Sequence, residues 1–105
     1  MNTNKEQYFI IRCDRAGVFY AQIIEHKDLP SGTNLLIANA RKAHGWDGAC
    51  AVEELAVNGP QVEGGGNRWT VRVPEMEVAS AIQIIPVTDA AKARIEAMPE
   101  WKRAQ

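Results

Sequence analysis

The 105 residues suit one small domain, and a composition of 46% hydrophobic and 24% charged residues excludes a disordered chain and a coiled coil. With 12 basic and 13 acidic residues the net charge is -1, so the strong positive excess that general nucleic-acid binding requires is missing. No apolar run approaches the roughly 20 residues that span a bilayer, and the polar N-terminus contains no signal-peptide region. We therefore expect a polar tail over 1–7, a single domain over 8–105, a cytoplasmic location and no membrane partner.

Three strands are predicted in the N-terminal half, over residues 8–13, 18–25 and 34–40. The first two are rich in β-branched and aromatic side chains. A turn at 14–17 joins them, in which Gly17 can take a positive φ, so the two strands form a hairpin. A second turn is expected at 29–32, because Pro30 has no N–H to donate within a ladder.

A short helix is predicted over 50–57, where apolar residues recur at helical spacing. Asp47 is its candidate N-cap, and Asn58-Gly59-Pro60 supplies the stop signal. The glycine-rich tip at 64–67 is not a phosphate-binding loop, because no Lys-Ser/Thr pair and no helix follow it.

Residues 68–74 alternate with period two and predict a fourth strand. Its apolar and polar side chains face opposite sides: Trp69, Val71 and Val73 against Arg68, Thr70 and Arg72. Residues 75–79 are expected to connect this strand to a last one over 81–88, which ends near Pro86.

The C-terminal part predicts a helix from Asp89 to about Met98, with Thr88 as its cap. Trp101 in the tail is expected to fold back as an apolar plug or to take part in a subunit contact. Consecutive strands with short turns favour antiparallel pairing. The predicted class is therefore α+β: a curled antiparallel sheet of about five strands with a short central helix and a C-terminal helix.

The segment 41–49 concentrates the chemistry of the chain. Its expected ligand-binding residues are polar or aromatic and lie close together in the sequence: Arg41, Lys42, His44, Trp46 and Asp47. Cations beside an aromatic ring and a glycine-opened backbone are what a protein offers to a flat anionic ligand such as a nucleotide. The indole would stack on a base, the arginine and lysine would neutralise phosphate, and the histidine or aspartate would hydrogen-bond a base or a ribose. The alternative is structural, with the indole in the core, the aspartate as a helix cap and the cations solvated.

Arg68 and Arg72 complete the expected ligand-binding set. A single core of this size has little room for a cavity, so we expect a homo-oligomer in which a second copy covers these arginines and forms a composite pocket. The alternative is that both arginines face solvent.

No catalytic residue, metal site or cofactor is expected. A Cys50–His44 pair is conceivable, but no third group that would orient it is evident. Cys13 and Cys50 occur without a CxxC motif and are expected to be two buried thiols.

Several strings of the chain resemble a family of small phage and prophage proteins of unassigned function. They are Tyr8-Phe9-Ile10-Ile11-Arg12-Cys13-Asp14-Arg15-Ala16-Gly17-Val18-Phe19-Tyr20, Ala40-Arg41-Lys42, Trp46-Asp47-Gly48-Ala49, Leu55-Ala56-Val57 and Ile84-Ile85-Pro86. The similarity extends from Tyr8 to Trp101. The family carries an aromatic or basic-aromatic pair before the Trp-Asp-Gly-Ala string, where this chain has His44 and Gly45, so Trp46 is the main aromatic residue here.

The resemblance implies a viral accessory protein in the host cytoplasm. Together with the segment 41–49, it suggests a non-enzymatic protein that binds a host immune signalling nucleotide, either a cyclic oligonucleotide or an ADP-ribose derivative, and sequesters it to inhibit anti-phage defence. The alternative function is an inhibitor that binds a host defence protein directly through a strand or a helix surface. A buried Trp46 would favour the second function, and an exposed Trp46 would favour the first.

Overall fold

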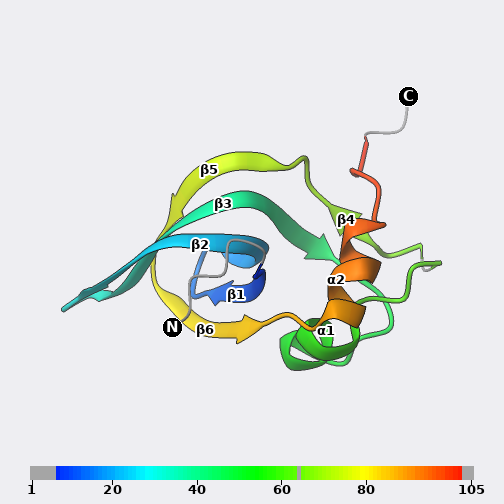
Figure 1. Cartoon of the computed structure of the whole chain (residues 1–105), viewed down its shortest axis with the longest axis horizontal. Helices are drawn as coiled ribbons and strands as arrows, with labels where there is room; N and C mark the ends of the chain where they lie inside the picture. Colours follow the sequence, from blue (N-terminus) through cyan, green and yellow to red (C-terminus); the bar gives the residue numbers. More distant parts are fainter. Residues whose placement is uncertain (1–6, 64, 103–105) are drawn as a thin grey trace.

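Two long strands, β2 (Gly17–Leu29) and β3 (Gly32–Gly45), form the middle of a curled antiparallel sheet in the computed structural model, which describes residues 7–63 and 65–102. The other elements are shorter: β1 (Phe9–Cys13), α1 (Val52–Asn58), β4 (Arg68–Trp69), β5 (Val73–Val78), β6 (Ala81–Pro86) and α2 (Asp89–Glu96). The strand order is β4-β3-β2-β1-β6, and β5 also pairs with β3. Both helices lie at one end of the curl (Figure 1). The predicted α+β class and architecture are confirmed.

Buried side chains lie on both faces of the middle of the sheet, and alternation along each strand explains why. Successive side chains of a strand point to opposite faces. On β1, Phe9 and Ile11 pack with Phe19 of β2 in a cluster of strand residues. Between them, Ile10 points the other way and packs with Tyr20 and both helices. The hydrophobic core is therefore split by the sheet into a strand-side cluster and a helix-side cluster.

A β-bulge at Asn39 changes which face the second half of β3 presents. Tyr20 pairs with Arg41 but Gln22 pairs with Ala38, so β3 carries one extra residue between these pairs. Asn39 takes a φ of 50°, and its side chain donates a hydrogen bond to Gln22 at 2.6 Å. As a consequence, the alternation of β3 is reversed beyond the bulge, and Arg41 points to the helix side of the sheet.

Three predicted boundaries are wrong. The third strand continues to Gly45, so the cations of segment 41–49 lie on a strand and not in a loop. The strand predicted over 68–74 is broken after Trp69, because the carbonyl of Thr70 bonds to the Arg41 side chain. Its three polar side chains therefore do not share one strand face. The expected connector 75–79 instead belongs mostly to β5, which pairs with β3.

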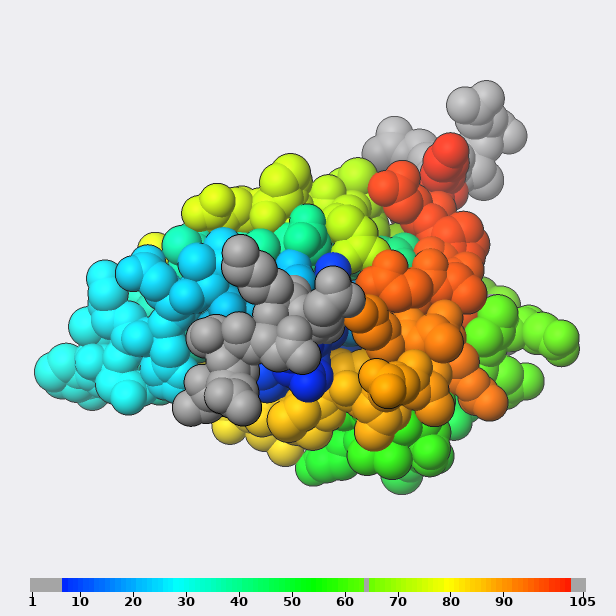
Figure 2. All heavy atoms as spheres, viewed as in Figure 1, coloured from blue at the N-terminus to red at the C-terminus, as the bar shows by residue number. Residues whose placement is uncertain are grey.

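The outer halves of β2 and β3 project from the body of the molecule as a hairpin arm, defined here as residues 24–33 (Figure 2). β1 pairs only with residues 17–21 of β2, and β5 only with residues 35–40 of β3. Near the tip, hydrogen bonds from Thr33 and then His26 hold the pKa of Asp28 below its usual range. The turn predicted at 29–32 is therefore present, but the strands on either side of it extend closer to the turn than the predicted ranges 18–25 and 34–40.

The ends of the helices follow local capping rules. Gly59, with a φ of 77°, ends α1 and donates its N–H to the carbonyl of Leu55. Thr88 caps α2 by accepting a hydrogen bond from the N–H of Ala91 at 3.1 Å, and its hydroxyl donates to the carbonyl of Val57 at 2.6 Å. Thr88 thus joins the end of α1 to the start of α2. No helix in the described part of the chain is long and apolar enough to cross a membrane.

We expect Thr88→Ala to lower the free energy of unfolding by about 1–2 kcal/mol, because it removes both hydrogen bonds of the cap. Urea unfolding followed by circular dichroism measures the change. Thr88→Ser keeps the hydroxyl and is the matched control, expected to retain most of the stability. Equal stability of the alanine variant and the native protein would contradict this role.

Candidate functional site

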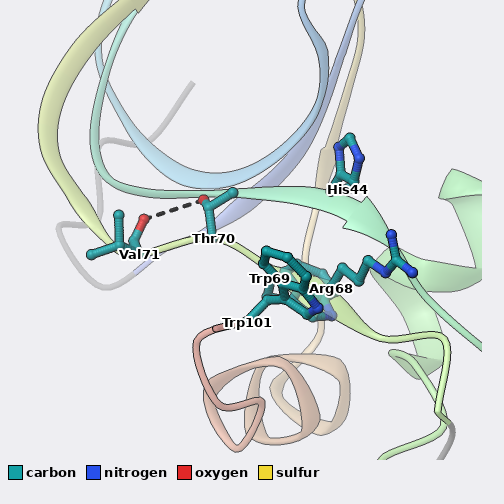
Figure 3. A pocket seen from close by; sticks show the side chains of 6 residues that line it. All are labelled: His44, Arg68, Trp69, Thr70, Val71 and Trp101. Atoms are coloured by element: carbon teal, nitrogen blue, oxygen red, sulfur yellow. Dashed lines mark hydrogen bonds between the residues drawn. The ribbon is translucent and has the colours of Figure 1, made fainter. Parts of the chain in front are cut away.

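A pocket of about 360 Å³ opens where the end of β3, β4 and the segment after α2 meet. Its lining combines two indoles with two basic side chains and two small residues: His44, Arg68, Trp69, Thr70, Val71 and Trp101 (Figure 3). The pocket joins segments that lie far apart in the sequence. Only their pairing in the fold creates it.

The floor of the pocket is the indole of Trp69. Its side chain is 1% exposed and belongs to the helix-side cluster of the core, while its backbone pairs with Ala43 of β3. The indole Nε1 is buried and has no hydrogen-bond partner among the residues that the structure describes. Buried polar groups are nearly always hydrogen-bonded, so this donor needs an explanation.

Trp101 forms the outer wall. The backbone after α2 folds back onto β4, and the N–H of Trp101 donates to the carbonyl of Trp69 at 2.9 Å. The Trp101 side chain is nevertheless 54% exposed, and the guanidinium of Arg68 lies 5.7 Å from its ring centroid. A flat aromatic surface and a cation therefore stand side by side at the mouth, which is the pairing that nucleotide sites use.

Arg41 lies beneath the pocket and not in it. Its side chain is 3% exposed and donates to the carbonyls of Thr70, Ile95 and Pro99 at 3.0–3.3 Å. Its guanidinium also covers the Trp69 ring at 5.8 Å. Burial and then the neighbouring Arg72 lower the pKa of Arg41, yet a guanidinium keeps its charge in proteins. Arg41 is therefore a structural cation that holds β3, the chain after β4 and the end of α2 together.

Lys42 and Arg72 are also placed away from the pocket. The Lys42 side chain passes over Gly17, where a Cβ atom would come within 2.9 Å of its Cε. Arg72 forms an ion pair with Glu96 at 2.8 Å and donates to the carbonyl of Asn39 at 2.9 Å. Glu96 in turn accepts a hydrogen bond from the hydroxyl of Tyr20 at 2.6 Å.

Trp46 and Asp47 brace the loop between β3 and β4. The Trp46 ring is partly buried against the helix-side cluster, and its Nε1 donates to the carbonyl of Ala49 at 3.2 Å. The Asp47 carboxylate accepts a hydrogen bond from the N–H of Gly66 at 2.6 Å. The predicted N-cap role of Asp47 is wrong, because α1 begins later, with Ala51 at the N-cap position and no side-chain cap.

The same brace accounts for the glycines of the loop. Gly48 has a φ of 80°, and a Cβ atom there would lie 2.5 Å from the Cβ of Gln61. A Cβ atom at Gly66 would collide with the Asp47 carboxylate. Gly48 lies close to Gln61 and Gly66 lies close to Asp47, so both positions require glycine.

Of the seven residues expected to bind the ligand, His44 and Arg68 line the pocket, while the other five lie elsewhere: Arg41, Lys42, Trp46, Asp47 and Arg72. Sequence reasoning put Trp69 on the apolar face of a strand, but it did not predict that Trp69 or Trp101 would line the pocket. The available signal was the tail itself, in which a large aromatic residue stands between charged Glu100 and Lys102.

The two cysteines are free thiols in different environments. Cys13 is buried, and burial raises its pKa, whereas Cys50 is exposed. The expectation of two buried thiols is therefore wrong for Cys50, which precedes α1 and donates its N–H to Glu54 at 2.7 Å. Across residues 7–63 and 65–102, no group of three or more His, Cys, Asp and Glu residues could hold a metal ion.

We expect Arg41→Leu to lower the free energy of unfolding by about 3 kcal/mol or more, because three carbonyls lose their donor at once. Arg12→Leu is the matched control, since Arg12 is exposed and should change stability by no more than about 0.5 kcal/mol. Urea unfolding compares the two variants. A loss at Arg41 no larger than at Arg12 would show that the buried cation does not hold the segments together.

We expect Ellman's reagent to modify one thiol of the native protein quickly and the second only on unfolding. The fast thiol is Cys50 because it is exposed, and the slow one is Cys13 because it is buried and its pKa is raised. In Cys50→Ser the fast phase should disappear. Two thiols that react at equal rates in the native protein would contradict this assignment.

No curated protein and no solved structure matches the chain. One family does, through a sequence profile that matches residues 6–95 and so includes His44, Arg68 and Trp69 but not Trp101. The chain therefore belongs to the family described as a domain of unknown function, DUF6948.

Proposed function

We propose that the chain is a non-enzymatic nucleotide-binding protein whose ligand occupies the pocket between Trp69 and Trp101. The observation that carries this function is the exposed indole of Trp101 with the Arg68 guanidinium 5.7 Å from its centroid, at the mouth of a pocket of about 360 Å³. An indole offers a stacking surface to a base, and a guanidinium offers a fork of donors to phosphate. His44 adds a second basic side chain to the lining.

The size and polarity of the pocket restrict the ligand. Its volume lies at the lower end of the range of about 300–1,000 Å³ for small-molecule sites. One base with its sugar would fill it, so a larger cyclic oligonucleotide would place a single base in each chain. In this arrangement a second copy of the chain covers the exposed Val71 and Trp101, and the protein acts as a homo-oligomer.

Binding without turnover is the activity that we propose for this pocket. The hydroxyl of Thr70 is already engaged, since it accepts from the N–H of Lys42 at 2.8 Å and donates to the carbonyl of Val71 at 3.2 Å. It is thus held as part of the wall and not poised as a nucleophile. As a phage accessory protein in the host cytoplasm, the chain would sequester an immune signalling nucleotide and so inhibit defence.

A second candidate function uses the same surface. Val71 is 58% and Trp101 is 54% exposed, and the Arg68 guanidinium lies beside the Trp101 ring. Aromatic and arginine side chains are also frequent anchors in protein interfaces. In this case the chain would inhibit a host defence protein by binding it directly.

We expect a thermal-shift screen to identify the ligand class among cyclic dinucleotides, cyclic trinucleotides and ADP-ribose derivatives. A ligand at 100 times its Kd stabilises the fold by about 2.7 kcal/mol, which should raise the Tm of a domain of this size by roughly 10 °C or more. Chromatography of the released ligand should return it intact. A chemically altered ligand would indicate an enzyme, and no shift across the panel would favour the protein inhibitor.

We expect Trp101→Ala to weaken binding of the selected nucleotide by about 5- to 150-fold, the equivalent of roughly 1–3 kcal/mol for one stacked base. Arg68→Gln should weaken it through the lost phosphate contact, whereas the exposed Arg15→Gln is the matched control and should leave the Kd unchanged. Isothermal titration calorimetry measures all three. Unchanged affinity in both pocket variants would place the ligand elsewhere.

A further inference from the structure

One residue that lines the pocket has a polar group with no hydrogen bond in the described part of the chain. The Nε1 of Trp69 is buried and lacks a partner among the described residues, although burial of a donor without an acceptor is unfavourable. Two polar groups close to it are already engaged: the guanidinium of Arg41 by three carbonyls and the hydroxyl of Thr70 by two backbone groups.

The Trp69 side chain cannot turn outward to reach bulk water while the fold stays intact. Its backbone is held on both sides, by pairing with Ala43 and by the hydrogen bond from the N–H of Trp101. Its ring is packed in the helix-side cluster, with the Arg41 guanidinium 5.8 Å from the ring centroid. Trp69 also lines the pocket, and a molecule that enters the pocket can supply an acceptor once the side chains that cover the buried Nε1 shift.

We propose, on the basis of the nucleotide-binding function above, that Trp69 is a specificity-determining residue whose indole N–H donates to a ring nitrogen or carbonyl oxygen on the edge of the bound base. The distribution of charge supports a base at this depth and not a phosphate. Arg68 is exposed and lies at the mouth, whereas the inner lining is indole and small side chains. The ligand therefore enters base first, with Trp101 against the face of the base, Trp69 at its edge and the phosphate near Arg68.

This arrangement selects for a particular chemistry. A nucleoside monophosphate unit supplies a flat ring, an acceptor on the edge of that ring and an anion, and each meets one of the three groups. An aromatic phosphate without a ring acceptor supplies only the first and the third. Buried donors that are left unpaired discriminate strongly against such analogues.

The test uses the ¹⁵N-labelled native protein and its indole N–H resonances, assigned through the single variants Trp46→Phe, Trp69→Phe and Trp101→Phe. Adenosine, guanosine, cytidine and uridine 5′-monophosphate are titrated in turn, with benzyl phosphate as the analogue without a ring acceptor. We expect at least one nucleotide to move the Trp69 resonance downfield in both dimensions, and benzyl phosphate to affect the Trp101 resonance only.

The outcomes separate the two proposals. If a nucleotide perturbs Trp101 but leaves Trp69 unchanged, the pocket binds nucleotides and the role of Trp69 is wrong. If no nucleotide perturbs either resonance, the nucleotide-binding function is wrong as well. These readings come from the native protein, and the variants serve only to assign its indole resonances.

Trp69→Phe provides an independent measure, because phenylalanine keeps an aromatic ring in the core and removes the N–H. We expect the variant to bind the responsive nucleotide at least tenfold more weakly and to bind benzyl phosphate as the native protein does. Trp46→Phe is the matched control, since the Trp46 indole N–H already donates to Ala49 outside the pocket. An equal loss for the nucleotide and for benzyl phosphate would indicate a distorted pocket and would overturn the role of the N–H.

Discussion

The arrangement of this protein depends on one buried cation. Arg41 is 3% exposed, and its guanidinium donates to three carbonyls in two segments that are separate in the sequence. Two of these carbonyls, of Ile95 and Pro99, belong to the end of α2 and the turn beyond it, where a positive charge is favoured by the helix dipole. Because Pro99 lies two residues before Trp101, the same contacts set the position of the tail against β4, and the pocket depends on them.

Arg41 can reach those carbonyls only because of the bulge at Asn39. Without the extra residue, alternation along β3 would place Arg41 on the same face as Leu35 and Ile37, in the apolar strand-side cluster. The bulge is itself supported from the helix side, since its carbonyl accepts from Arg72, which is paired with Glu96 of α2. Backbone irregularity and buried charge are thus parts of one network between β3 and α2.

The elements that could be predicted from the sequence are those that depend on local rules. The β1–β2 hairpin follows from strand propensity and a glycine turn, and α2 from Thr88 and the acidic Asp89. The break after Trp69 and the bulge at Asn39 depend on contacts with residues 28 or more positions away, or on strand register, and no local pattern encodes them. Arg41 and Asp47 show the same limit at the site, because each has the chemistry of a ligand residue and uses it inside the fold.

The three tryptophans have different roles, and the roles follow from the hydrogen-bond acceptor that each indole N–H can reach. The indole N–H of Trp46 donates to the carbonyl of Ala49 three residues along the chain, so this ring has a structural role in the loop. Trp101 is more than half exposed, so its N–H can be hydrated and its ring is free to stack. In Trp69 the donor is buried and unpaired within the described chain, and the same ring forms the floor of the pocket. A polar group kept in that state costs stability, and the benefit that would offset the cost is recognition of a ligand that brings the acceptor.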